Sequence, residues 1–326
     1  MRFLITGIGG FVGPYLARTL LESGHAVWGI VRRPGSSRHL TDLHEAYPEG
    51  FPGESVLAAD LLDPRAVRSA VAAVRPDGLF HLAGMSFVPA AEADPLAAYR
   101  TNFFGTLNVL RAVREAQPAC RVVCAGSGEA YGAAGNEVAV LTEDVPFRPV
   151  SAYAVSKAAA DLAAFEWSWG GGNVVRARPF NHTGAGQRPD FVCSDFARQV
   201  ARIEQGLQPP VLEVGNLDVE RDFTDVRDIV DGYVGLWERG TGGEAYNLCS
   251  GRGTRIGAVV EELCRRARCS IEVRVSEGRR RGREVRRLVG SFAKAEAHAA
   301  WSPRRSLAGA LDDLLAHWRR HVAAGR

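Results

Sequence analysis

Two side chains that can exchange a proton lie one helical turn apart in the segment YAVSK. Tyr153 and Lys157 are four residues apart, so in a helix they share one face. A lysine cation beside a tyrosine favours the phenolate, and the spacing predicts a pKa for Tyr153 below its usual value of about 10. Such a pair is also common on exposed helices. Ser127, upstream in SGEAYG, adds specificity because its hydroxyl can hydrogen-bond the same reacting oxygen. The three residues indicate acid–base chemistry on a hydroxyl or carbonyl group.

A glycine-rich turn near the start of the chain predicts a dinucleotide site. Gly7 permits a tight turn, Gly10 lets the backbone approach a pyrophosphate, and Gly13 lets a helix pack closely on a strand. The helix that follows offers free N–H groups and a partial positive charge to phosphates. Phe11 and Val12 complete the predicted site. A turn that uses glycine only for its geometry is the alternative.

The end of the next apolar run predicts which dinucleotide binds. NAD sites usually place Asp or Glu there for the ribose hydroxyl, whereas this chain has Arg32 and Arg33. Two guanidinium groups suit a 2′-phosphate, so we expect NADP(H), with NAD(H) as the alternative. Asp60 and Leu61 follow the third apolar run and are predicted to meet the adenine. Asp63 is expected to cap the helix that begins at Pro64.

These residues must be positioned by alternating strands and helices. Strands are predicted at 2–6, 26–31, 55–59, 78–82, 121–125 and 174–177, and helices at 11–22, 64–74, 95–116 and 151–167. The alternation predicts an α/β fold, a doubly wound parallel sheet with helices on both faces. Beyond Pro179 the regular alternation of strands and helices ends, and helices are expected at about 194–205, 226–238, 256–266 and 306–319. A smaller carboxyl-terminal region is therefore expected over the carboxyl edge of the sheet, where such folds bind ligands.

Composition excludes several other classes of protein. The chain has 326 residues, of which 46% are hydrophobic and 24% charged, which is ordinary for globular domains. Forty basic against 37 acidic residues give a net charge of +3, too small to indicate nucleic-acid binding by itself. No apolar run approaches the roughly 18 residues of a membrane span, and glycine comes too early for a signal peptide. We expect a cytoplasmic protein whose six cysteines are reduced.

Motifs along most of the chain resemble the extended short-chain dehydrogenases/reductases that act on nucleotide sugars. The matching segments, in family order, are TGIGGFVG (6–13), DLLD (60–63), HLAG (81–84), TNFFGTLNVL (101–110), SGEAYG (127–132), YAVSK (153–157) and RPFN (178–181). The resemblance implies a Rossmann-type fold, with residues 1–178 as the dinucleotide-binding domain and 179–326 mainly as the substrate-binding region. Segments at about 215–250 are expected to return to the sheet.

The resemblance also implies roles for individual residues. Ser127, Tyr153 and Lys157 would perform the chemistry, and Asn102 would support them. Cofactor contacts would come, in addition to the residues above, from Leu82, Ala83, Gly84, Tyr153, Lys157 and Pro179.

The second half resembles the GDP-4-keto-6-deoxy-D-mannose reductases, which use a nicotinamide cofactor to reduce the C4 ketone and form GDP-D-rhamnose. The matching segments are 178–206, 214–233 and 279–291, the last with Gly282 where proline is usual. Near relatives form the C4 epimer, GDP-6-deoxy-talose. Arginines suit the diphosphate of a GDP-sugar. The candidate substrate residues are Ser86, Ser127, Asn181, Val192, Arg198, Arg221, Arg281 and Glu284.

Glu129 leaves a second activity open. In the related 4,6-dehydratases a glutamate at this position removes the C5 proton, but the residue before it is usually Ser or Asp, where this chain has Gly128. A 4-epimerase is a further alternative, and a non-catalytic NADP-sensing regulator is another. Relatives that act as regulators typically lack the tyrosine or the lysine, and Tyr153 and Lys157 are both present. In the reductase interpretation Glu129 binds a substrate hydroxyl or is structural.

The remaining expectations concern partners. The six arginines between 279 and 287 lack interleaved aromatics, so no nucleic-acid partner is expected. His81, His182 and the cysteines are expected to be structural, and no metal site is expected. Family members commonly pair through two helices, here 95–116 and 151–167, which predicts a homodimer. No membrane partner is expected.

Overall fold

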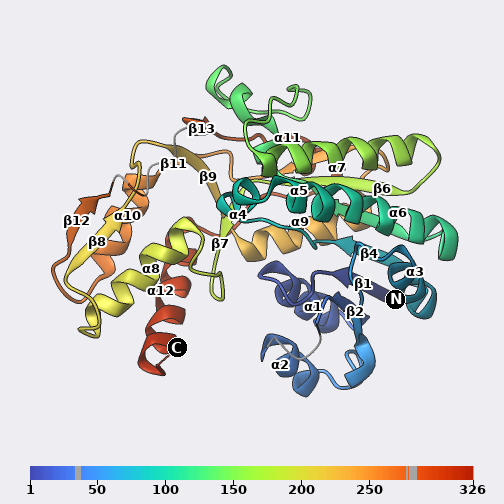
Figure 1. Cartoon of the computed structure of the whole chain (residues 1–326), viewed down its shortest axis with the longest axis horizontal. Helices are drawn as coiled ribbons and strands as arrows, with labels where there is room; N and C mark the ends of the chain where they lie inside the picture. The colour runs from blue at the N-terminus through green and yellow to red at the C-terminus, as the bar shows by residue number, and fades with distance from the viewer. Residues whose placement is uncertain (34–37, 277, 279–284, 326) are drawn as a thin grey trace.

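One sheet of seven parallel strands positions the predicted site (Figure 1). The computed structural model describes residues 1–33, 38–276, 278 and 285–325. The strands are β1 (Arg2–Thr6), β2 (Ala26–Val31), β3 (Val56–Ala58), β4 (Gly78–His81), β5 (Arg121–Ala125), β6 (Val174–Pro179) and β10 (Ala245–Leu248). Their order in the sheet is β10-β6-β5-β4-β1-β2-β3, so the chain runs outward from β1 in both directions. This confirms the predicted α/β fold with a doubly wound, Rossmann-type sheet.

Helices cover both faces of this sheet. The first face carries α1 (Val12–Glu22), α2 (Arg38–Ala46), α9 (Val226–Arg239) and α11 (Ala293–Ala299). The second carries α3 (Pro64–Val74), α6 (Gly105–Ala116) and α7 (Ala152–Trp169). Because apolar helices bury the sheet on both sides, central strands such as β4 are buried at every residue. The predicted start of α3 is confirmed, since Asp63 caps it by accepting the N–H groups of Arg65 and Ala66.

The helix predicted over 95–116 is interrupted. The structure has α4 (Val88–Ala93), α5 (Pro95–Tyr99), a π-helical turn η2 (Arg100–Phe104) and then α6. Within the turn, the Gly105 N–H donates to the Arg100 carbonyl, five residues earlier. Such π turns occur mainly as single insertions and often lie at functional sites. Here the turn holds the buried side chain of Asn102.

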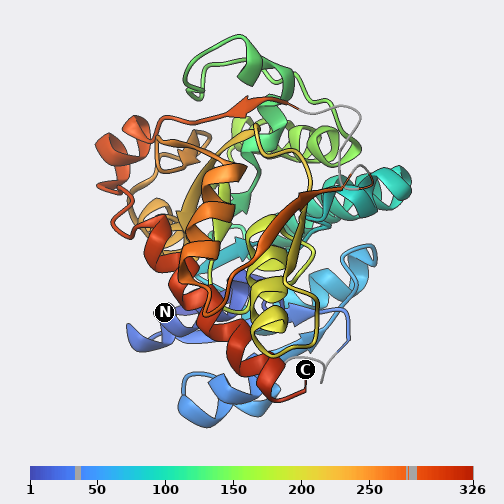
Figure 2. The same ribbon diagram turned by 90° about the vertical axis from the view of Figure 1, so that its left-hand side faces the viewer.

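A smaller region follows β6 and has its own core. Its strands are β7 (Asn181–Thr183), β8 (Val211–Val214), β9 (Glu220–Asp225), β11 (Gly253–Arg255), β12 (Glu272–Val275) and β13 (Arg287–Leu288). Its helices are α8 (Val192–Glu204), α10 (Ile256–Arg266) and α12 (Leu307–Ala323), and α12 lies along α8 (Figure 2). The described residues also include the 3-10 segments η1 (Gly53–Ser55) and η3 (Gly128–Asn136), the second of which is kinked at Gly132. The division into domains at residues 178 and 179 stays a prediction, and α9 and β10 pack with the large sheet.

Three further features bear on the sequence-based expectations. All six cysteines are free thiols, and four of them are buried. Within the described residues, no group of three or more His, Cys, Asp or Glu is arranged to hold a metal ion. No helix among those residues is long and apolar enough to cross a membrane.

Candidate active site

The predicted catalytic residues meet at the carboxyl edge of the sheet. Ser127 follows β5 and caps η3, where its hydroxyl accepts the N–H of Glu129. Tyr153 and Lys157 lie in the first turns of α7, which begins at the cap residue Ser151. Their exposed fractions are only 7% for Ser127 and 8% for both Tyr153 and Lys157. The fold therefore brings together three polar side chains in a largely desolvated place.

The prediction of a lowered pKa for Tyr153 is wrong in this structure. Burial raises the pKa of Tyr153 to about 12, against a smaller lowering by a hydrogen bond with Ser127, and the charge of Glu129 raises it further. The physical reason is that desolvation disfavours the phenolate more than nearby groups favour it. Tyr153 is consequently a neutral phenol at neutral pH, the form that can donate a proton.

Lys157 points beneath the site rather than into solvent. Its Nζ donates to the carbonyl of Ala125, at 2.6 Å, where β5 ends. Burial lowers the pKa of Lys157, while the charges of Cys124 and Asp161 raise it. A Cβ built on Gly84 would lie 3.7 Å from the Lys157 Nζ, so the turn after β4 passes beside the ammonium group. The predicted cofactor-lining segment and Lys157 are thus neighbours.

Asn102 connects that turn to α7, the helix that carries Tyr153 and Lys157. Its Oδ1 accepts the N–H of Met85 at 2.7 Å, and its Nδ2 donates to the Met85 carbonyl at 3.0 Å. The same Nδ2 donates to the Ser156 hydroxyl at 2.8 Å, and Ser156 donates to the Tyr153 carbonyl at 2.7 Å. Asn102 therefore holds the backbone next to the predicted catalytic residues.

The glycine turn has the geometry that a dinucleotide needs. Gly7 has φ +75°, and a Cβ there would lie 2.8 Å from the Ala83 backbone, so only glycine fits. A Cβ on Gly13 would lie 2.4 Å from the carbonyl oxygen of Ile8, which shows how closely α1 packs on the turn. The first turn of α1 has no acidic residue and no side-chain cap, and its N–H groups suit phosphates. Phe11 stacks parallel to His182, with ring centroids 6.1 Å apart.

Residues predicted to select the cofactor lie around the same turn. Arg32 and Arg33 are exposed directly after β2, next to the glycine turn, whose Gly7 N–H donates to the Ile30 carbonyl. Asp60 is exposed and accepts the N–H of Leu62 at 2.9 Å. The side chain of Leu61 is buried in the core beneath α3 and α6. Leu82, Ala83 and Gly84 continue from β4, and Pro179 ends β6.

An ion pair links the site to the smaller region. The Nε of Arg221, on β9, lies 3.9 Å from Oε1 of Glu129, on η3. Arg221 is largely buried, and its Nη1 donates to the carbonyls of Glu220 and Val285. Two predicted residues from distant parts of the sequence thus lie together beside Ser127.

The other predicted substrate residues are less tightly grouped. Ser86 is exposed after β4, Asn181 begins β7, and Val192 begins α8. Arg198, on α8, pairs with Asp195 at 3.7 Å. Arg281 and Glu284 lie outside the described residues, as do four of the six arginines between 279 and 287.

A buried charged network beneath α7 was not anticipated from the sequence. Asp161 accepts Nη1 of Arg176 at 2.6 Å and Nε of Arg178 at 2.9 Å, and Arg178 donates to the Tyr131 hydroxyl at 2.8 Å. Asp161 lies one turn after Lys157, on the same helix face. The spacing of four residues between Lys157 and Asp161 could have indicated the network, as could the two arginines in the otherwise apolar strand β6. The network fastens α7 to β6.

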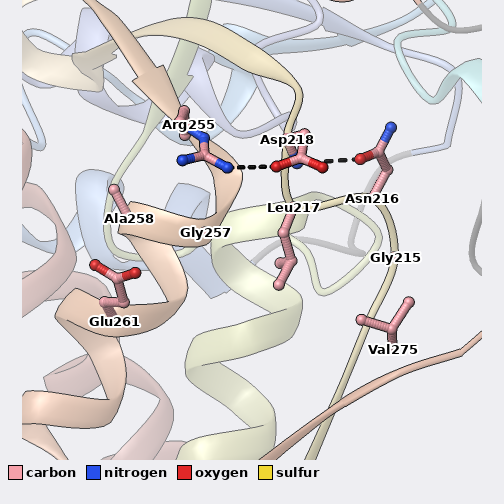
Figure 3. A pocket seen from close by; sticks show the side chains of 9 residues that line it. All are labelled: Gly215, Asn216, Leu217, Asp218, Arg255, Gly257, Ala258, Glu261 and Val275. Carbon is pink, nitrogen blue, oxygen red and sulfur yellow. Dashed lines mark hydrogen bonds and ion pairs between the residues drawn. The ribbon is translucent and has the colours of Figure 1, made fainter.

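A separate pocket lies in the smaller region (Figure 3). Its volume is about 380 Å³, and none of the predicted catalytic residues lines it. Arg255 and Asp218, which both line the pocket, form an ion pair, and the backbone N–H of Asp218 donates to Oδ1 of Asn216 (Figure 3). The predicted chemistry therefore belongs to the sheet edge rather than to this pocket.

The sheet, the glycine turn and the Ser127, Tyr153 and Lys157 set define the class of short-chain dehydrogenases/reductases with a dinucleotide-binding Rossmann fold. Within that class, the chain belongs to the family described as GDP-mannose 4,6 dehydratase, whose model matches residues 4–314.

Relatives match over nearly the whole chain. The GDP-6-deoxy-D-mannose reductase of Pseudomonas aeruginosa is 35% identical over 322 residues, 98% of each chain. A GDP-6-deoxy-D-talose 4-dehydrogenase of Aggregatibacter actinomycetemcomitans is 27% identical over 90% of each chain. Among solved structures, RMD from P. aeruginosa, complexed with NADPH, superposes with a TM-score of 0.84 at 33% identity, covering 98% of this chain and 99% of that one.

Proposed function

We propose that this protein reduces the C4 ketone of GDP-4-keto-6-deoxy-D-mannose with NADPH, giving GDP-D-rhamnose or its C4 epimer, GDP-6-deoxy-talose. One observation carries the proposal. A neutral, buried Tyr153 lies close enough to Ser127 for that hydroxyl to influence its pKa, on the same helix as the buried Lys157, in a chain similar over 98% of its length to a GDP-6-deoxy-D-mannose reductase. The similarity to a GDP-6-deoxy-D-talose 4-dehydrogenase supports the same reaction type.

The chain's own residues supply the proton chemistry. Tyr153 gives its phenolic proton to the ketone oxygen as that oxygen becomes an alkoxide, and Ser127 hydrogen-bonds the same oxygen where charge develops. Lys157 stabilises the phenolate left on Tyr153 until solvent returns a proton. A bound nicotinamide cofactor would supply the hydride for the carbonyl carbon. Ketone, hydride and proton together give the alcohol.

The residues present fit NADP(H). Gly7, Gly10 and the uncapped start of α1 form a cradle for the pyrophosphate, and Lys157 lies beside Gly84, where a nicotinamide ribose would be held. Arg32 and Arg33 stand where an acidic residue would select NAD. The similar structure of RMD contains NADPH, which supports this choice, whereas other similar structures contain NAD.

Cofactor choice is tested by substituting the arginines. Arg33→Ala should weaken NADPH binding about tenfold to 100-fold, the loss typical of a hydrogen bond to a charged group, and leave NADH binding nearly unchanged. Arg68→Ala, an exposed arginine on α3 paired with Glu115, is the control. Equal effects on both cofactors would contradict the assignment.

Basic and polar side chains near the site are the candidates to bind the GDP-sugar. Arg221 is the leading candidate for the diphosphate because its guanidinium is a largely buried cation beside Glu129, next to Ser127. Asn181, at the start of β7, and Arg198, on α8, are second candidates. Arg281 and Glu284 stay sequence-based predictions.

A 4,6-dehydratase is the second candidate activity, and the position of Glu129 favours it. Glu129 is close enough to Tyr153 for its charge to raise the pKa of that phenol. The ion pair with Arg221 favours the reductase, because the carboxylate of Glu129 is engaged by a guanidinium from the smaller region. In the reductase, Glu129 orients Arg221 or binds a sugar hydroxyl.

The function is tested with purified protein, NADPH and GDP-4-keto-6-deoxy-D-mannose. Loss of NADPH should match the deoxyhexose formed, and NMR of the product identifies the C4 epimer. Tyr153→Phe should lower turnover by about 100-fold to 10,000-fold, the usual contribution of a general acid, and retain NADPH binding. Tyr47→Phe, whose hydroxyl binds Glu22 at the end of α1, is the matched control. Conversion of GDP-mannose to the keto sugar without added reductant would instead establish the dehydratase.

We also propose that the protein is a cytoplasmic homodimer with no nucleic-acid or membrane partner. Large apolar side chains lie exposed along α7 and the adjoining η2, with 58% exposure for Leu162, 85% for Trp169 and 52% for Phe104. Apolar groups arranged in this way favour burial against a second copy. Leu162→Glu should give a monomer by light scattering, whereas Leu207→Glu, an exposed leucine in the smaller region, should not. An unchanged molar mass for Leu162→Glu would contradict this interface.

A further inference from the structure

A chain of buried hydrogen bonds runs across the sheet under the candidate site, centred on His81. The Thr6 hydroxyl lies 2.7 Å from Nδ1 of His81, and the Thr106 hydroxyl lies 2.9 Å from Nε2. The three residues come from β1, β4 and α6, and they are 0%, 3% and 2% exposed. Thr6 and His81 are also register partners in the neighbouring strands β1 and β4. A polar chain this deep in an α/β core is held by its own hydrogen bonds.

The protons of this chain can be assigned. The Thr106 hydroxyl also lies 2.6 Å from the carbonyl of Asn102, which can only accept, so Thr106 donates there and must accept from His81 Nε2–H. Neutral His81 then accepts the Thr6 hydroxyl proton at Nδ1. Thr6 in turn accepts the N–H of Ala83 at 3.3 Å. Every donor and acceptor is satisfied by a single tautomer.

The two ends of the chain reach two different functional elements. At one end, Thr6 immediately precedes Gly7, and Ala83 is the residue whose backbone a Cβ on Gly7 would meet at 2.8 Å. At the other end, Asn102 continues through the Ser156 hydroxyl to the carbonyl of Tyr153. The dinucleotide turn and the catalytic helix are thus joined through one imidazole.

We propose that His81 is a positioning residue that anchors the dinucleotide-binding turn through Nδ1 and anchors Asn102, with the helix that carries Tyr153, through Nε2. Each imidazole nitrogen makes one hydrogen bond, Nδ1 with Thr6 next to the dinucleotide-binding turn and Nε2 with Thr106 next to Asn102. The proposal rests on the proposed function, since it assumes that Gly7 binds a dinucleotide and that Tyr153 is the acid. It predicts that loss of the Thr6 hydrogen bond mainly impairs NADPH binding, whereas loss of the Thr106 hydrogen bond mainly impairs turnover. A histidine that only fills space would show no such division.

The surroundings of His81 keep its imidazole ring neutral. Burial lowers the pKa of His81 to about 3, and the nearby charge of Lys157 lowers it further. A protonated ring would carry a hydrogen on Nδ1 as well, and the Thr6 hydroxyl would lose its acceptor. The stable tautomer is therefore part of the geometry that links the two elements.

Isosteric variants on either side test the two anchors separately. Thr6→Val removes the hydroxyl on the turn side and should weaken NADPH binding about tenfold with a smaller effect on kcat. Thr106→Val removes the hydroxyl on the Asn102 side and should lower kcat about tenfold or more with NADPH binding within about twofold, since small displacements of catalytic groups are costly. His81→Gln, which can retain a donor near the Nε2 position, should retain more turnover than His81→Phe, which retains neither nitrogen.

Thr19→Val is the matched control. The Thr19 hydroxyl also donates to the carbonyl four residues earlier, that of Tyr15, and within the described part of the chain it has no hydrogen bond to a histidine. Circular dichroism and gel filtration identify variants that fail to fold. If both His81 variants fail to fold, the threonine variants by themselves test the two anchors. Equal losses of kcat in Thr106→Val and Thr19→Val, or no split between binding and turnover, would overturn the proposal.

The experiment separates this proposal from the proposed function. If the wild-type protein binds NADPH but does not reduce the keto sugar, the proposed function fails. NADPH affinity, which requires no turnover, then still tests the anchor on the dinucleotide-binding turn. Weaker binding in both Thr6→Val and His81→Phe supports it, and unchanged binding in both refutes it.

Discussion

Acidification offers a direct test of the buried neutral His81. Its pKa is lowered to about 3 in the folded protein, mainly by burial, against about 6.5 in an unfolded chain. Below about pH 6.5 the unfolded state therefore binds a proton that the folded state does not. Stability is lost as the pH falls from about 6.5 towards 3, and it is retained above about 6.5.

The size of the effect follows from linkage. One proton gives a slope of about 1.4 kcal/mol per pH unit, so lowering the pH from about 6.5 to about 5 should remove about 2 kcal/mol of stability through His81 alone. His81→Gln has no group that titrates in this range. The free energy of unfolding of wild type minus that of His81→Gln should accordingly fall by about 2 kcal/mol between about pH 7.5 and pH 5.

Urea unfolding at several pH values measures this difference. Other histidines, such as the buried His182 with its lowered pKa, titrate in both proteins and cancel in the subtraction. The nitrogen chemical shifts of the His81 ring provide a second measure and should show the Nε2–H tautomer down to about pH 4. A difference in unfolding free energy that is constant with pH, or a ring that protonates near pH 6.5, would refute the assigned tautomer and with it the directed chain of hydrogen bonds.

Three other predictions test the site. Because the pKa of Tyr153 is raised to about 12, the ultraviolet difference spectrum between wild type and Tyr153→Phe should show no tyrosinate from Tyr153 below about pH 10; a midpoint near pH 7 would contradict the neutral phenol. Asp161→Asn leaves two buried arginines without their carboxylate and should lower the free energy of unfolding by about 3–5 kcal/mol. The control Asp190→Asn removes an exposed ion pair and should cost at most about 1 kcal/mol. Similar losses in the two variants would argue against a buried network. Gly7→Ala should weaken NADPH binding measured by fluorescence, because the added Cβ meets the Ala83 backbone, and unchanged affinity would show that the turn adapts.

Local patterns in the sequence determined much of the fold. Apolar runs ending in glycine or polar residues placed β1, β2 and β5 at the predicted residues, and Asp63–Pro64 placed the start of α3. These predictions depend only on hydrophobic periodicity and on capping chemistry between residues near in the chain. The glycine spacing and the YxxxK spacing depend on the same local geometry, so the dinucleotide turn and the shared face of Tyr153 and Lys157 could be read directly.

The tertiary structure decided what depends on burial and on distant contacts. The pKa of Tyr153 was predicted in the wrong direction because a sequence shows that a lysine is near, but not how completely both groups are removed from water. The π turn at Asn102 was missed because a five-residue hydrogen bond leaves no periodic signal. The ion pair between Arg221 and Glu129, and the path from Thr6 through His81 to Thr106, join segments that only the folded sheet places side by side.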